Sequence, residues 1–164
     1  MTGIKAKYTI KDFLPLIVIV VVILLFAVGT TLYSNQDWMF GMRMFMSGFF
    51  LVFGLLKASK LSDFAMAYQK YDLIAKRSTT YAFLYPFIEI GLGLLFFSWI
   101  ASTLTLLLTI VLMLVSAVGV YKKLQQKEEI MCACLGTVFK VPMTWVTLAE
   151  NLLMVGMATI MLLV

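Results

Sequence analysis

The sequence has no histidine, only two cysteines and few charged residues. Lys, Arg, Asp and Glu make up 13% of its 164 residues, whereas an ordinary soluble domain carries about 25%. Without histidine the chain lacks the commonest general base and the commonest zinc ligand, and two cysteines are too few for a disulfide scaffold. These shortages argue against soluble enzymes and nucleic-acid-binding domains. No residue set predicts an active site for hydrolysis, group transfer or nucleotide binding.

Apolar residues make up 63% of the chain, and its mean hydropathy is +1.03, which predicts an all-α membrane protein. About 20 apolar residues cross the hydrocarbon core of a bilayer, which is about 30 Å thick. Residues 78–121 contain one ionisable acid or base, Glu89, and as one helix they would be about 66 Å long, so we expect a hairpin at Ser98–Thr103. The five expected spans cover about 13–33, 38–56, 80–99, 102–121 and 142–164.

Residues 62–77 combine aromatic residues at helical spacing with polar residues. This pattern predicts an amphipathic helix along the membrane surface between the second and third spans. No repeat, low-complexity tract or long linker marks a domain boundary, so we expect residues 1–164 to form one polytopic membrane domain.

The basic residues predict the orientation, since cytoplasmic loops are enriched in Lys and Arg. When the segments between five spans are assigned to alternate sides, every basic residue except Arg43 falls on one side. We therefore expect the amino terminus in the cytoplasm and the carboxyl terminus outside, in a plasma membrane such as the bacterial inner membrane. The segment Lys122–Lys140, with both cysteines, would then face the cytoplasm.

The two cysteines stand in the segment Met131-Cys132-Ala133-Cys134. Three interpretations remain open. The thiols could be small apolar fillers, or they could form a labile redox pair, because a disulfide between such near neighbours closes a strained ring. They could also bind Cu(I) or another thiophilic ion, with the Met131 thioether as a third ligand.

Two carboxylates lie inside expected spans, Glu89 in the third and Glu150 in the fifth. Ionisable groups at this depth are costly and usually have a partner inside the bundle. By depth, Arg43 pairs with Glu89 and Lys57 with Glu150. These pairs could hold helices together or belong to a functional pathway.

Methionines recur along two expected spans. Met42 and Met46 lie four residues apart in the second, and in the fifth Glu150 begins a helical stripe with Met154, Met157 and Met161. Methionine is a common core filler, but thioethers are also weak Cu(I) ligands. The stripe could therefore be packing or a metal relay.

One further motif lies around Glu89. Pro86 is expected to kink the third span one turn before this acid, and the small residues Gly91 and Gly93 would let a neighbouring helix approach.

The sequence resembles the MauE/DoxX superfamily of small redox-associated membrane proteins. The features that carry the resemblance cover about residues 40–164. They are Phe45–Phe50 leading to Lys57, Phe64–Tyr71, Tyr85–Gly93 and the segment Cys132–Phe139 followed by Pro142-Met143 and Glu150. The last of these is typical of a branch often fused to a heavy-metal-associated domain. The resemblance implies a four-helix bundle core, to which the first span would be an N-terminal addition.

The resemblance implies two different kinds of function. MauE is linked to maturation of a disulfide-rich subunit of methylamine dehydrogenase and DoxX-type proteins to thiol or quinone redox work, whereas the metal-domain fusions imply soft-metal handling. The leading hypothesis is Cu(I) binding or transport through the methionines and carboxylates to Cys132 and Cys134. The alternatives are a thiol-redox component using the same cysteines and a non-catalytic assembly subunit. The expected partners are the lipid bilayer and a metallochaperone or thioredoxin-like protein. A homo-oligomer is left open, and no nucleic-acid partner is expected.

Overall fold

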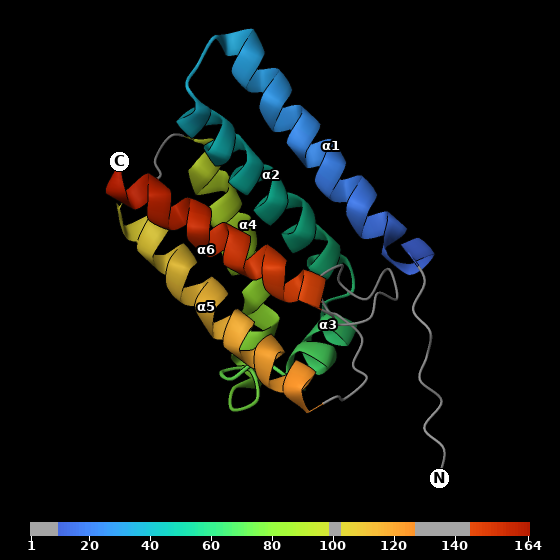
Figure 1. Cartoon of the computed structure of the whole chain (residues 1–164). Helices are drawn as coiled ribbons and strands as arrows, with labels where there is room; N and C mark the ends of the chain where they lie inside the picture. Colours follow the sequence, from blue (N-terminus) through green and yellow to red (C-terminus); the bar gives the residue numbers. More distant parts are fainter. Residues whose placement is uncertain (1–9, 99–102, 127–144) are drawn as a thin grey trace.

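The computed structural model describes residues 10–98, 103–126 and 145–164, and these form six helices (Figure 1). In chain order they are α1 (Ile10–Ser34), α2 (Trp38–Ser59), α3 (Leu61–Tyr68), α4 (Thr79–Phe97), α5 (Thr103–Gln125) and α6 (Trp145–Leu163).

Four of these helices, α1, α2, α4 and α5, are long and apolar enough to cross a membrane. The protein is therefore a multi-pass membrane protein. The apolar stretch of α6 is shorter, Thr147–Leu163, and matches the part of the expected fifth span that the structure describes. The hairpin expected near Ser98 agrees with the end of α4 at Phe97 and the start of α5 at Thr103.

The long helices pack mainly as neighbouring pairs. α2 lies between α1 and α4, α5 packs along α6, and α3 lies against the first turns of α4 and the end of α2. In Figure 1, α1 lies along the outside of α2. Among the described residues α1 has no close backbone approach to α6, so the first helix leaves one side of α6 uncovered.

The turn between α1 and α2 ends the first span sharply. Asn35 adopts a left-handed conformation with φ 51°, which asparagine tolerates better than most residues. The amides of Asn35 and Gln36 donate back to the carbonyls of Leu32 and Thr31 at 3.3 and 3.2 Å. These bonds satisfy the last carbonyls of α1 and allow α2 to run back alongside it.

The amphipathic helix expected over 62–77 is shorter in the structure, because α3 ends at Tyr68 and turns follow up to residue 77. The cause is the buried Asp72 side chain, whose Oδ1 accepts hydrogen bonds from the amides of Ile74 and Ala75 at 2.9 Å each. Asp competes in this way for backbone donors that a helix would use. Asp72 therefore starts a new turn instead of continuing α3.

Two groups of buried side chains form the core. The apolar cluster gathers side chains of α1, α2, α4, α5 and α6, among them Met46, Phe50, Phe53, Phe96 and Met154. The tyrosine cluster lies at the α3 end of the bundle and includes Phe64, Tyr68, Tyr71, Tyr85, Ala117 and Val120. The candidate site lies where these two groups meet.

A candidate polar cavity inside the bundle

A small polar cavity lies between α2, α3, α4, α5 and α6, with a volume of about 30 Å³. A water molecule needs about 10–15 Å³ of such space, so the cavity accommodates a water-sized group. Its wall combines aromatic rings with ionisable and hydroxyl side chains. The polar lining residues are Lys57, Tyr68, Tyr71, Tyr85, Glu89, Ser116, Thr147, Glu150 and Asn151.

The centre of the cavity wall is a buried ion pair between α2 and α4. The Lys57 ammonium donates to both carboxylate oxygens of Glu89 at 2.6 Å, and the exposed fractions of the two side chains are 8% and 2%. Aromatic rings surround the ammonium, with the Tyr85 ring centroid 5.1 Å and the Phe64 centroid 5.8 Å from Nζ. The rings add cation–π attraction to a charge that the pair already neutralises.

This ion pair corrects the expected partners, because Glu89 binds Lys57 and not Arg43. The reason is the position of α4 along the bundle axis relative to α2. α4 packs against both α3 and α2, so its first turns lie beside α3 and its middle reaches only the end of α2. Arg43 stands fourteen residues before Lys57, which is about 21 Å away along the helix.

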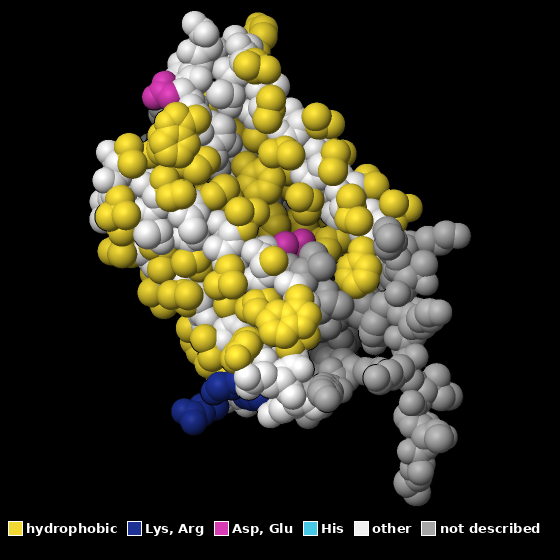
Figure 2. Space-filling view, in the orientation of Figure 1, with side chains coloured by type: hydrophobic (Ala, Val, Ile, Leu, Met, Phe, Trp, Pro, Cys, Tyr) yellow, Lys and Arg dark blue, Asp and Glu magenta, His cyan; other side chains and the backbone are white. Residues whose placement is uncertain are grey.

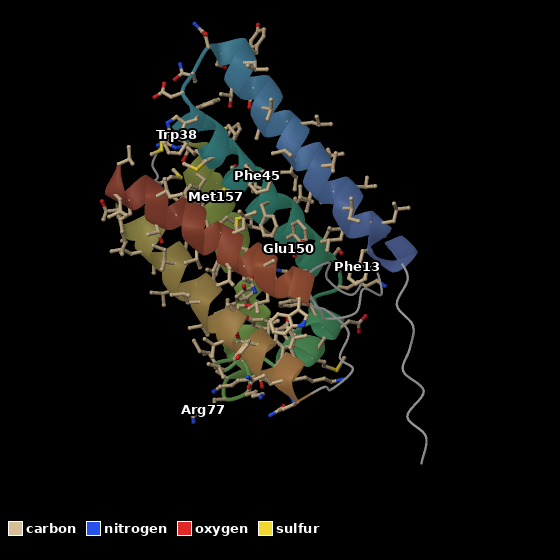
Figure 3. All side chains as sticks on the ribbon, in the orientation of Figure 1. Phe13, Trp38, Phe45, Arg77, Glu150 and Met157 are labelled. Carbon is tan, nitrogen blue, oxygen red and sulfur yellow. The ribbon has the colours of Figure 1, made fainter. Side chains whose placement is uncertain are left out.

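Glu150 reaches the same cavity from α6. It also lines a groove on the outside of the bundle between α6 and α1. In Figure 2 a carboxylate lies within an apolar face, at the position that Figure 3 labels Glu150. Glu150 is not the ion-pair partner of Lys57, which binds Glu89. Beside it, the Asn151 amide donates to the Ser116 hydroxyl at 3.4 Å.

The tyrosine cluster closes the cavity on the α3 side. Tyr68 donates to Oδ2 of the buried Asp72 at 2.9 Å, and its ring lies 4.4 Å from that of Tyr85. Burial raises the pKa of Tyr68 well above its ordinary value, and Tyr85 and the Asp72 carboxylate raise it further. The phenol therefore stays protonated and acts as a donor.

Sequence reasoning did not identify Tyr68, Tyr85 and Asp72 as site residues. A signal was present, because Tyr68, Tyr71, Tyr81 and Tyr85 recur at three- or four-residue spacing within each helical segment and Asp72 stands between them. Tyrosine at such spacing is common at membrane surfaces, however. Only the fold shows that these rings cover an ion pair.

The candidate methionine ligands divide between two places. Met46 and Met154 are fully buried in the apolar cluster, and Met161 packs against it half-buried. Met42 and Met157 line an apolar groove between α1, α2 and α6, and Met157 also packs against the apolar cluster. The methionines therefore do not form one continuous stripe facing the cavity.

The candidate sulfur ligands Met131, Cys132 and Cys134 lie outside the residues that the structure describes. Within residues 10–98, 103–126 and 145–164, no three His, Cys, Asp or Glu side chains are grouped closely enough to hold a metal ion.

Comparison with known families shows which family the chain belongs to. The family model described as methylamine utilisation protein MauE matches residues 11–164. The chain belongs to the MauE family. The match begins at residue 11 and so covers nearly all of α1 together with the other helices. Searches of curated proteins and of solved structures gave no significant match to this MauE-family chain.

Proposed function

We propose that this MauE-family protein is a thiol-redox membrane component in which Cys132 and Cys134 exchange a disulfide with a partner protein. The buried polar cavity is its proton-handling site. The observation that carries the proposal is the chemistry of that cavity, where the described lining residues include one cation, Lys57, and two carboxylates, Glu89 and Glu150.

The lining of the cavity favours proton exchange over passage of a Cu(I) ion. Among the described residues it offers ionisable and hydroxyl side chains and a single thioether, from Met113, which is a poor ligand set for Cu(I). Glu150 faces the same space without being the ion-pair partner of Lys57. It can take up or release a proton while the Lys57–Glu89 pair stays neutral overall.

The thiol–disulfide exchange needs no reagent other than this chain and its partner. A thiolate of Cys132 or Cys134 attacks the partner's disulfide and forms a mixed disulfide, and one partner sulfur leaves as a thiolate. The second cysteine then attacks the mixed disulfide and releases the other partner sulfur. Two electrons and two protons pass from this dithiol to the partner, and the reverse reaction reduces this pair again.

Trapping the mixed disulfide tests the proposal. With Cys132→Ser or Cys134→Ser, the remaining thiol cannot be resolved, so acid-quenched cells are expected to contain a reducible adduct between this chain and a thioredoxin-like protein. The double serine variant should form none. If neither single variant gives an adduct, the thiol-redox function is wrong.

Soft-metal binding is a second candidate, and the observation that favours it is that Met42 and Met157 line one groove. In this function Met131, Cys132 and Cys134 would form the tight Cu(I) site, and the other methionines would be weak ligands. Titration of the reduced protein with Cu(I) should then give thiolate-to-metal charge transfer that is lost in the double serine variant. The same result would support assigning the chain to the metal-domain branch of the family.

The proposed orientation places Cys132 and Cys134 in the cytoplasm, with the amino terminus inside and the carboxyl terminus outside a plasma membrane. It is supported by the fold, because α3, the start of α4 and the end of α5 with Lys122 and Lys123 lie at one end of the bundle. A membrane-impermeant maleimide should label the two cysteines only after the cells are opened. Labelling in intact cells would reverse this orientation.

A further inference from the structure

A long apolar groove runs along the outside of the bundle between α1 and α6. It has two adjoining sections of about 420 Å³ each, and Leu153 lines both. The groove exists because α1 packs against α2 and makes no close backbone approach to α6 within the described part of the chain. In Figure 2 most of the coloured side chains on this face are apolar.

The groove is longer than one leaflet of a bilayer. On α1 it extends from Leu16 to Leu32, sixteen residues or about 24 Å, whereas half of the hydrocarbon core is about 15 Å. One end is bordered by Trp38 and the other by Glu150. An extended chain lying in it would therefore pass the bilayer midplane.

Glu150 gives the groove a polar end. Among the described residues that line the two sections it is the one ionisable side chain, and the Thr31 hydroxyl already donates to the Ala27 carbonyl at 2.7 Å. Glu150 also lines the polar cavity. With Lys57 and Glu89 forming a neutral pair, the remaining carboxylate favours a head that donates hydrogen bonds and disfavours an anionic one.

We propose that this groove binds a lipid-soluble molecule with one long apolar chain joined directly to a small head that donates a hydrogen bond to Glu150. The chain lies between α1 and α6 with its far end near Trp38. The head lies at the mouth of the polar cavity. The described residues that line the groove carry this proposal, so it does not depend on the proposed thiol chemistry.

A bilayer phospholipid does not fit this site. Glu150 is five residues into α6 from Trp145, or about 8 Å along the helix axis, and tryptophan favours the membrane–water interface. A phosphate head remains at that interface, and its negative charge would be repelled by Glu150. A hydroxyl at the end of a single chain can reach the carboxylate at this depth.

Quenching of Trp38 fluorescence tests the site. In the full chain with Trp99→Phe and Trp145→Phe, Trp38 is the only tryptophan. The protein in phosphatidylcholine nanodiscs is titrated with hexadecanol that carries bromine at its chain end. We expect saturable quenching above the linear background. Bromine next to the hydroxyl should quench far less, because the head would lie at Glu150.

Three variants check the assignment. Glu150→Ala should raise the concentration of brominated hexadecanol at half-saturation about tenfold or more. This is the effect of losing a hydrogen bond to a charged group. Leu153→Phe should reduce saturable binding by filling the groove, and it should be tolerated because Leu153 is 52% exposed. Leu152→Phe is the matched control, since Leu152 is 49% exposed on the same helix but lines neither section.

The proposal is overturned if quenching stays linear, if bromopalmitate binds as well as bromohexadecanol, or if all three variants behave alike. A change in oligomeric state caused by Leu153→Phe, without saturable quenching in the parent protein, would also overturn it and assign the groove to a second copy of the chain. Each result can be obtained with both cysteines replaced by serine. Failure here is therefore distinguishable from failure of the thiol-redox function.

Discussion

The apolar cluster and the tyrosine cluster are held together by different kinds of interaction within one bundle. In the apolar cluster the contacts are between rings and thioethers, such as Phe49 and Phe53 with ring centroids 4.3 Å apart. In the tyrosine cluster the rings of Phe64 and Tyr85 lie against the Lys57 ammonium, and the Tyr68 hydroxyl donates to Asp72. Buried charge lies at the second cluster, and the candidate site lies there too.

The comparison shows what stabilises each part. Lipid tails are as apolar as the side chains of the apolar cluster, so close packing and not burial from water must hold its helices together. The tyrosine cluster depends instead on charges and donors that each need one defined partner. Removing one side of the buried ion pair should therefore cost more than exchanging one apolar side chain for another of similar size.

The largest effect is expected from Lys57→Met, which leaves the Glu89 carboxylate buried without its cation. Breaking one side of a buried pair typically costs about 3–5 kcal/mol, and we expect a loss of that size in the free energy of unfolding, measured by titration with SDS in mixed micelles. Lys57→Met combined with Glu89→Leu should recover most of it. If the double variant is as unstable as the single one, the ion pair is not the cause.

Gly93→Ala should have the next largest effect, because it tests close packing between α2 and α4. A Cβ at Gly93 would lie 2.7 Å from Cγ and 3.0 Å from the backbone nitrogen of Leu51. Overpacking of this kind costs about 1–3 kcal/mol. Gly91→Ala is the matched control on the same helix, since a Cβ there meets nothing within 4 Å. Equal unfolding curves for the two variants would contradict this packing.

Tyr68→Phe sharpens the comparison within the tyrosine cluster. The variant removes one donor from Asp72, which keeps its bonds from the amides of Ile74 and Ala75, so we expect a loss of about 2 kcal/mol in unfolding free energy. Tyr33→Phe should change nothing, because Tyr33 is 94% exposed. A Tyr68→Phe protein as stable as the parent would show that this bond adds no stability.

Much of the fold could be predicted from the sequence, because helix length and the absence of charge are local properties. The spans around 13–33, 38–56, 80–99 and 102–121 each correspond to a long apolar helix. The end of α3 was missed, because the pattern over 62–77 suits a helix and only the burial of Asp72 reveals the turn.

The charged residues that line the candidate cavity were predictable, but their pairing was not. Glu89, Glu150 and Lys57 stand out because charge inside a span is rare. Their pairing depends on how far α4 extends past the end of α2, which no local pattern records. The two glycines of α4 looked equivalent in the sequence, yet only Gly93 lies against Leu51.

The smallest effect is expected from Met46→Leu, which separates packing from metal binding in the apolar cluster. Met46 is fully buried among apolar side chains, and exchange of Met for Leu in a core usually costs less than about 1.5 kcal/mol. If Met46 is a filler, Cu(I) titration of the variant should match that of the parent and of Met66→Leu, a control in which the side chain is 60% exposed. A selective loss of Cu(I) affinity in Met46→Leu would instead make this methionine a ligand. The apolar cluster would then carry chemistry of its own, and the contrast between the two ends of the bundle would fail.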